Sequence, residues 1–412
     1  MPIFNRRPDA GTSELLNPAA MIDEGVMLNK DGAVLAGWRL HGPDLESADA
    51  AELEALSARI HRALRSFGNG YEVHFQSVRS TSRRYAAAGD FPDPTSLLIE
   101  DERRRDHESD GRHYETQTYF TLTYLVRPDT ERRALRFFLE SSLLEADAQA
   151  ELLATFSSTC ERVEDQLGSV FELERLDSVG LLSLMKFCIT GIEQRMRVPV
   201  PPMYLDYHLA PANLRVGLTP MVGDQHVRVV AITDFPAESS PAMLDELSSL
   251  SIVYRWSVRF LPLDLPTAEA RLKVIQRQWF QKRKGLMSLA REVVGDEPGP
   301  EDGDADHMAG DASTALALAS EGELRFGYFT SVVVLFGEDA HDVDESARAV
   351  LKAIHGLGFS GRIEDVNSVE AYLGSIPGHG FRNVRRPIMH SLNLADMIPS
   401  TTIWTGDRRG AR

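Results

Sequence analysis

The chain has 412 residues, a length that suggests two or three domains with cores large enough to fold without disulfides or metals. Its 61 acidic residues outnumber the 44 Lys and Arg residues. A net charge of −17 argues against broad non-specific attraction to nucleic acid or anionic lipid, while leaving room for a local basic patch. Two cysteines, Cys160 and Cys188, are too few for a disulfide framework. No apolar stretch reaches the roughly 20 residues of a membrane span, and the start does not resemble a signal peptide. Composition therefore predicts a soluble, cytosolic, multidomain protein.

The first half of the chain predicts alternating strands and helices after a flexible polar leader over residues 1–20. Asp49, with Glu52 three residues later, predicts the capped start of a helix that runs to Phe67, because the apolar residues that follow have helical spacing. The other elements expected in this half are strands over 33–40, 71–78 and 116–126, and one or two helices over 130–167.

The second half begins after a linker at residues 199–202, where three prolines in four residues disfavour a helix. Ser240 followed by Pro241 predicts the N-cap of a short helix that ends near Leu250. The other elements expected in this half are strands over 227–234, 252–261, 325–336 and 362–366, helices over 267–294, 307–320 and 342–355, and an acidic loop over 295–306.

Each half therefore runs β-α-β, an inserted helical region, then β-α, with a further strand in the second half. This order predicts an α+β fold of two ferredoxin-like (split β-α-β) subdomains, each with its own antiparallel sheet, and long inserted helices. The expected division is a flexible leader over 1–20, an N-terminal α+β subdomain over 21–198, the linker over 199–202, a second α+β subdomain over 203–390 and a tail over 391–412.

Nucleotide-binding motifs are missing or out of place. A phosphate-binding loop needs Gly-x4-Gly-Lys followed by Ser or Thr, and the dipeptide Gly-Lys occurs nowhere in the chain. Gly356, Gly358 and Gly361 have the spacing of a dinucleotide-binding loop. However, they follow a predicted helix and precede a predicted strand, which is the reverse of the required order. We expect them to form a helix C-cap and turn.

Metal-binding and catalytic motifs are also incomplete or absent. Asp302, Asp304 and Asp306 alternate as in a calcium loop, but His307 stands where that loop needs glycine and Ser313 where it needs a bidentate Glu. The 12 histidines have no zinc-site spacing, and no Gly-x-Ser-x-Gly elbow occurs. We therefore predict no catalytic, cofactor-binding or metal-ligating residue, and no cofactor, in this chain.

Two charged segments each allow two interpretations. The run Glu100–Arg105 places acidic and basic residues at i,i+4 spacing, which favours a solvated, self-paired helix face or, alternatively, a basic ridge for a partner. The helix over 267–294 carries an apolar stripe interrupted by Lys282-Arg283-Lys284. This stripe favours a core-facing helix, with a docking or membrane-surface helix as the alternative.

The stretch Leu373–Pro387, with the sequence LGSIPGHGFRNVRRP, resembles a segment of the CagE/TrbE/VirB family, the conjugal-transfer ATPases of type IV secretion systems. The similarity continues through residues 390–396 and 404–406. Shorter TrbE-like pieces lie at residues 36–38, 42–45, 91–94, 101–104 and 303–306. The resemblance spans nearly the whole chain and is most specific over 373–406.

In that family this region is the amino-terminal part, and a RecA-like motor that carries the phosphate loop follows it. The resemblance therefore implies an assembly and interaction module, peripheral at the cytoplasmic face of the inner membrane. It would bind inner-membrane secretion subunits, copies of itself and the ATPase motor domain, with ATP and Mg belonging to the motor and no direct nucleic acid binding. The alternative is a fragment of a full-length ATP-hydrolysing enzyme of the TrbE type. A small-molecule enzyme is a third interpretation, disfavoured by the lack of a convergent catalytic cluster.

The resemblance also sets expectations for the end of the chain. The tail over 391–412 should pack poorly, because in the family it leads toward an ATPase domain. Its apolar residues should then be exposed: Leu392, Leu394, Met397, Ile398 and Trp404. The basic residues just before it, Arg382, Arg385 and Arg386, could offer a weak anion site or a contact for the motor.

Overall fold

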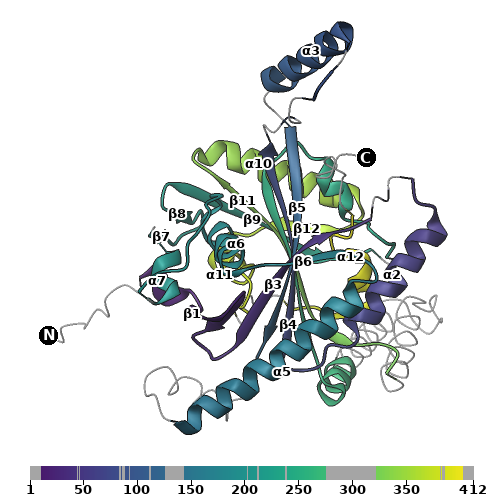
Figure 1. The fold of residues 1–412 in the computed structure, drawn as a ribbon. Coiled ribbons are helices and arrows are strands. Elements are labelled where there is room, and N and C mark those ends of the chain that lie inside the picture. Colours follow the sequence, from purple (N-terminus) through teal and green to yellow (C-terminus); the bar gives the residue numbers. More distant parts are fainter. Residues whose placement is uncertain are drawn as a thin grey trace, which may run out of the picture.

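The protein is described by a computed structural model (Figure 1). The described residues are 11–43, 45, 47–82, 85, 89–91, 93–110, 113–125, 143–201, 203–210, 213–236, 239–274, 322–380, 382 and 386–401. Several expected features lie outside these ranges: the acidic loop over 295–306, the helix over 307–320, most of the helix over 267–294, Arg385 and Trp404. The helix over 267–294 can be followed from residue 265 to residue 274 only.

The first half contains one ferredoxin-like unit. Its elements follow in the order β3 (Val34–His41), α2 (Ala50–Leu64), β4 (Tyr71–Ser82), β5 (His113–Tyr124), α5 (Leu143–Leu167) and β6 (Glu172–Arg175). The strands lie in the order β6-β3-β5-β4, all antiparallel. Asp49 accepts a hydrogen bond from the Glu52 amide while the Glu52 side chain accepts one from the Asp49 amide, so the predicted capping box starts α2.

The second half repeats this plan. Its elements are β9 (Gln225–Asp234), the 3-10 helix η1 (Asp245–Ser249), β10 (Tyr254–Pro262), β11 (Phe326–Gly337), α10 (Ala340–Gly356) and β12 (Ser360–Ile363). The strand order β12-β9-β11-β10 matches that of the first unit, position by position. The helix expected after Ser240 is shorter than predicted, since residues 241–244 form turns before η1.

The repeat extends beyond the core of each unit. A hairpin precedes each first strand: β1 (Pro18–Asp23) and β2 (Val26–Asn29) before β3, and β7 (Leu214–Arg215) and β8 (Met221–Val222) before β9. A helix follows each last strand, namely α6 (Ser178–Thr190) after β6 and α11 (Ser368–Leu373) after β12. The two predicted ferredoxin-like units are therefore present, as is the α+β class.

The prediction that each unit has its own sheet is wrong. β4 pairs with β10 in antiparallel register, Gln76 opposite Ser257, and this pairing joins both halves into one sheet, with 13 strands among the described residues. The backbone of β4, at the edge of the first unit, thus forms hydrogen bonds with β10, at the edge of the second unit. Neither strand is left as an open sheet edge. The domain boundaries expected at 198 and 203 stay a prediction.

Helices cover both faces of the sheet. On one face, α2, α5, α10 and α12 (Ser391–Met397) pack over a core that contains Phe75, Trp256 and Phe329. The other face carries α6, α7 (Leu205–Leu209) and α11. Because α6 and α11 follow the last strand of each unit, the sheet face that a lone ferredoxin-like unit leaves open is closed here.

The helix α3 (Pro94–Asp110), inserted between β4 and β5, stands away from the body of the molecule, beyond the far ends of those two strands (Figure 1). The prediction of i,i+4 pairing is confirmed where Arg104 Nη2 lies 3.8 Å from Glu100 Oε1. Three successive apolar side chains at its start are about half exposed: Leu97, Leu98 and Ile99.

The expectation of a loosely packed tail is wrong for residues 391–401. Leu394, Met397 and Ile398 are at most 1% exposed, because α12 packs against α2 and its apolar side chains join the core. Of the four such residues that the structure describes, Leu392, at 40%, is the one that is exposed as expected. The leader also differs from expectation, since residues 12–15 form the helix α1 (Thr12–Leu15) and residue 18 begins β1.

No helix in the described ranges is long and apolar enough to cross a bilayer.

Candidate functional site: a buried polar network under residues 374–380

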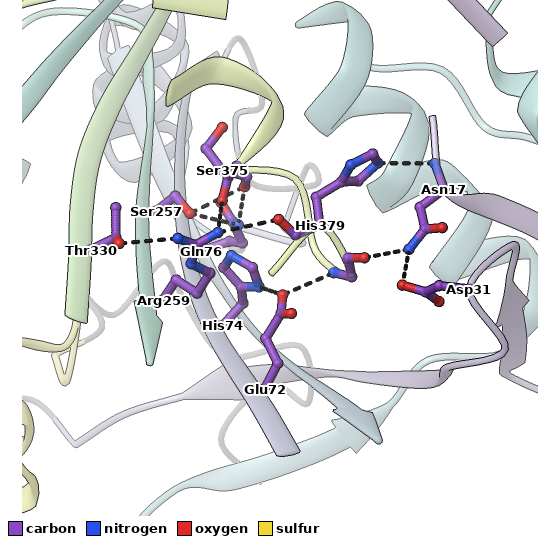
Figure 2. A network of polar contacts seen from close by, with 12 residues as sticks. Asn17, Asp31, Glu72, His74, Gln76, Ser257, Arg259, Thr330, Ser375 and His379 are labelled. Atoms are coloured by element: carbon purple, nitrogen blue, oxygen red, sulfur yellow. Dashed lines mark hydrogen bonds and ion pairs between the residues drawn. The ribbon is translucent and has the colours of Figure 1, made fainter. Parts of the chain in front are cut away.

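Polar side chains occupy the middle of the sheet on the face covered by α6 and α11. Strand alternation places Glu72, His74 and Gln76 of β4 on this face, while Val73 and Phe75 join the opposite core. Residues of β10 alternate in the same way and supply Arg255, Ser257 and Arg259. All six polar side chains are at most 1% exposed. The junction of the two units therefore carries a sealed polar stripe (Figure 2).

Arg255 ties this stripe to both flanking helices. Its Nη1 donates to the Ser375 carbonyl at 2.7 Å and to Gln76 Oε1 at 3.0 Å. Its Nη2 donates to Ser375 Oγ at 2.7 Å and to the Cys188 carbonyl in α6 at 3.2 Å. The Ser375 carbonyl also accepts from Gln76 Nε2 and Ser257 Oγ. One guanidinium thus joins the end of α6 to the segment that follows α11.

Arg259 holds the same segment at two further points. Its Nη1 donates to the Gly374 carbonyl at 3.1 Å and to the His379 carbonyl at 3.2 Å, while its Nη2 donates to Thr330 Oγ1. Glu72 Oε1 accepts from the Gly378 amide at 3.2 Å and lies 2.9 Å from His74 Nδ1. The segment 374–380 is therefore bonded along its length to side chains of β4 and β10 (Figure 2).

The far end of the segment is fixed by the start of the chain. The Asn17 amide donates to His379 Nε2 at 3.0 Å, and Asn17 Nδ2 donates to the Gly378 carbonyl at 2.7 Å and to Asp31 Oδ2 at 2.9 Å. Residues 361 positions apart in the sequence are thereby held together (Figure 2).

Burial and neighbouring charges decide the protonation of this cluster. Burial lowers the pKa of His379 to about 3, so its imidazole is neutral and accepts the Asn17 amide proton. Burial likewise lowers the pKa of His74. Burial alone would raise the pKa of Glu72, but the hydrogen bond from His74 and the positive charge of Arg259 outweigh it and keep that pKa below its ordinary value. Glu72 is thus a carboxylate facing Arg259.

The arrangement suits holding a loop in place. Its charged groups are sealed from solvent and donate to, or accept from, the chain's own backbone. Among the residues that the structure describes, no group of three or more His, Cys, Asp or Glu side chains could hold a metal ion. Gly380 approaches so closely that a Cβ there would lie 2.1 Å from Glu72 Oε2.

Two open depressions lie elsewhere on the described surface. One of about 520 Å³ beside α6 is lined by Arg39 and Arg195 but also by Asp177 and Glu193, which gives it charges of both signs. The other, of about 260 Å³, lies at the acidic start of α10. Neither contains the residues of the buried network.

The structure gives the positions of most of the candidate residues named from the sequence. Gly356 is the last residue of α10, Gly358 lies in the turn after it with φ +83°, and Gly361 lies in β12, which confirms a helix-end turn. Arg382 Nη1 lies 3.4 Å from Glu370 Oε1, an intramolecular ion pair, while Arg385 is outside the described residues.

Sequence reasoning missed the network itself. The available signal is the alternation of Glu, His and Gln over 72–76 and of Arg, Ser and Arg over 255–259. Alternating polar residues predict a solvent-exposed sheet face, so the signal points away from burial unless the covering helices are known.

Comparisons with known proteins match parts of both halves of the chain. One family model, the N-terminal domain of the type IV secretion system ATPase VirB4/TrbE, matches residues 25–132. A second, the CagE, TrbE, VirB family, component of type IV transporter system, matches residues 301–385, a range that includes the segment 374–380. The first of two polypeptides named as parts of a probable conjugal transfer protein TrbE in Sinorhizobium fredii is 32% identical over 123 residues, which cover 29% of this chain and 81% of that protein. This chain belongs to the CagE/TrbE/VirB family of type IV secretion components.

Longer relatives extend the match. A conjugal transfer protein TrbE of Rhizobium radiobacter is 34% identical over 413 residues, which cover 96% of this chain and 50% of that protein. The second of the two S. fredii TrbE polypeptides is 40% identical over 226 residues, 55% of this chain and 34% of that protein. The chain thus spans half the length of the R. radiobacter relative.

Proposed function

We propose that this chain is the assembly and interaction module of a type IV secretion (conjugal transfer) ATPase and that it docks the motor to the inner-membrane channel complex. The observation that carries the proposal is that the buried polar network binds the backbone of the chain itself. Its charged groups bind the segment 374–380 of the same chain, so the most family-like part of the sequence serves to build a rigid body. Such a body suits positioning other parts of a machine.

The surface supports the same proposal. The helix α3 projects from the sheet and exposes Leu97, Leu98 and Ile99 beside Arg103 and Arg105. Exposed apolar side chains rimmed by charges are typical of protein interaction sites. This is the partner-binding alternative left open for the charged run at 100–105.

We expect this polypeptide alone neither to bind nor to hydrolyse ATP appreciably. Phosphoryl transfer needs a backbone cradle, a Lys on the phosphates and a hydroxyl on Mg²⁺, and none of the 30 glycines is followed by Lys. Calorimetric titration with ATP and a phosphate-release assay on the 412-residue chain test this. Turnover at rates typical of the family's motors would contradict the proposal.

Docking is tested by co-purification of the chain with each detergent-solubilised inner-membrane subunit of the same secretion system. The triple variant L97S/L98S/I99S should weaken capture, whereas L392S, on another exposed position, should not. Failure of every subunit to co-purify with the wild-type chain would refute the docking role.

The alternative is that the chain is a fragment of a full-length ATP-hydrolysing TrbE-type enzyme. The coverage of half of the R. radiobacter protein favours it. An in-frame Gly-Lys-Ser or Gly-Lys-Thr in the coding sequence after Arg412, with ATP turnover only in the extended protein, would support this alternative.

A further inference from the structure

Residues 12–17 run from α1 to the start of β1, and we call them the N-terminal strap. The strap joins elements of both halves. α1 packs against α7, and Thr12 Oγ1 accepts from the Leu214 amide of β7 at 2.7 Å. On the other side, Lys30 Nζ, after β2, donates to the Ser13 carbonyl at 2.7 Å. The strap therefore lies across the end of the segment 374–380 rather than within the sheet.

The strap is lightly held compared with the segment beneath it. Of residues 12–17, Leu16 alone is buried, whereas residues 371–380 are all buried. The strap also lies outside the strands, since β1 begins after it at Pro18. Its release would therefore leave the ladders of the sheet intact, as a local opening does.

One contact of the strap depends on the protonation of a histidine. The Asn17 amide donates to His379 Nε2 at 3.0 Å (Figure 2). This bond needs a lone pair on Nε2, so the imidazole must be neutral with its proton on Nδ1. A protonated imidazole carries hydrogens on both nitrogens and accepts no hydrogen bond. Protonation of His379 would therefore set two donors against each other.

Charged and titratable groups surround His379 on several segments. They are Glu72 and His74 of β4, Arg259 of β10, Arg382 of its own segment, and Asp31, which Asn17 Nδ2 contacts at 2.9 Å. Glu72 favours the protonated imidazole, and the three basic groups oppose it. Burial has the largest effect and keeps the pKa of His379 at about 3 while the strap is in place, against an ordinary value of 6.5.

We propose that the N-terminal strap is a pH-sensitive switch, which holds at neutral pH and is released in acid when His379 is protonated. Because the pKa of His379 is lowered only in the strapped form, the histidine's contribution to holding the strap is complete above pH 6.5 and falls as the pH falls. The equilibrium shifts toward release by about tenfold for each pH unit below 6.5, or about 30-fold by pH 5. Release would expose Leu16 and the His379 end of the segment 374–380.

The test is native-state hydrogen exchange of the 412-residue chain at pH 7.5 and pH 5, with each rate divided by the intrinsic rate at that pH. The opening constant of the Asn17 amide should rise about 30-fold at pH 5. At both pH values it should exceed that of β5 amides and depend little on urea, because strap release exposes little surface. An Asn17 amide that opens only together with β5, or that shows no rise in acid, would overturn the proposal.

His379→Gln identifies the titrating group. Glutamine keeps an acceptor at a similar reach but does not titrate in this range, so the opening constant of the Asn17 amide should be the same at both pH values. His355→Gln is the matched control: His355 Nε2 also accepts a backbone amide, that of Gly361 at 3.4 Å, but on an exposed side chain away from the strap. This control should keep the rise of about 30-fold. A rise that persists in His379→Gln would refute the role of His379.

Asn17→Ala provides a second test that does not alter the histidine. It removes the Nδ2 bonds to Asp31 and the Gly378 carbonyl but keeps the backbone donor. The amide of residue 17 should therefore open more readily at both pH values, with the ratio of about 30 between them unchanged. Loss of that ratio would assign the pH response to Asp31, whose pKa burial raises, and would overturn the proposal.

Discussion

Gly380 has no room for a side chain. A Cβ there would come within 2.1 Å of Glu72 Oε2, and Glu72 cannot retreat freely because its other oxygen is held by the Gly378 amide and by His74. We therefore expect Gly380→Ala to destabilise the protein by about 1–3 kcal/mol, the usual cost of overpacking. Urea unfolding followed by circular dichroism measures the change.

Gly356→Ala is the matched control. Gly356 ends α10 and nothing lies within 4 Å of the place that a Cβ would take, so alanine should be neutral or slightly stabilising there. Equal effects of the two substitutions would contradict the close packing of the segment 374–380 on Glu72.

The residues of the network are individually visible in the sequence but their partners are not. Arg255 needs Gln76, Ser375 and Cys188, which lie 67 to 179 positions away along the chain. Local pattern gives the strand and the alternation of its side chains. It cannot reveal that the polar face is covered by α6 and α11, because that covering depends on how two units join.

Two carboxyl groups hold α12 and the segment after it, the buried Asp396 and the partly buried Asp245. Asp396 accepts hydrogen bonds from Ser57 of α2 and from Ser239, and Asp245 accepts from the Thr401 amide and Ser400 Oγ. Burial raises the pKa of Asp245 to about 6, although the bonds from Thr401 and Ser400 oppose the shift. Ionisation of Asp245 therefore costs the folded state free energy.

The sign of the pH effect follows from that raised pKa. The folded chain holds the Asp245 proton more tightly than the unfolded chain, so this group's contribution to stability falls as pH rises from about 4 to about 6 and is then constant. Asp245→Asn removes the charge and keeps an acceptor oxygen. Relative to wild type, it should gain roughly 2 kcal/mol at pH 8 and nothing at pH 4. Urea midpoints at the two pH values test this.

Asp339→Asn serves as the control for the same chemical change. Asp339 is the exposed N-cap of α10, and hydrogen bonds from the amides of Asp342 and His341 hold its pKa below the ordinary value. Asparagine also caps helices, but it lacks the charge that these hydrogen bonds stabilise, so Asp339→Asn should not gain stability between pH 4 and pH 8, the opposite sign to Asp245→Asn. A wild type more stable than Asp245→Asn at pH 8 would refute the charge penalty.

Elements with local signals follow the sequence prediction closely, and those that depend on packing do not. Four features are specified by residues close together in the sequence, and each appears close to its expected position. They are the capping box at Asp49, the strands at 71–78 and 227–234, and the glycine turn after α10. The tail differs from expectation because the family resemblance places a further domain after it. Its Leu394, Met397 and Ile398 instead complete the core over α2.

At the scale of the whole molecule, two units of the same plan form one sheet. The order of strands within each unit follows from the β-α-β rhythm of the sequence. The junction does not, because β4 and β10 each look like an edge strand until they meet. Both cores also mix residues of the two halves, as Phe75 with Trp256 and Leu181 with Val332 illustrate. The boundary suggested by the prolines at 199–202 is thus no barrier to shared packing.

A shared sheet and shared cores predict that the two halves unfold together. Opening the first half would strip β10 of a seven-residue ladder from Tyr254 to Phe260, expose Trp256 and leave Arg255 buried without Gln76. We therefore expect native-state hydrogen exchange in increasing urea to give β5 and β9, which lie in different halves, the same free energy of opening and the same urea dependence. As a control, amides of α3, which stands outside the shared core, should open at much lower urea. A protected β9 that persists after β5 has exchanged would instead mean that the halves are separate cooperative units, and that β4–β10 is a contact between two bodies.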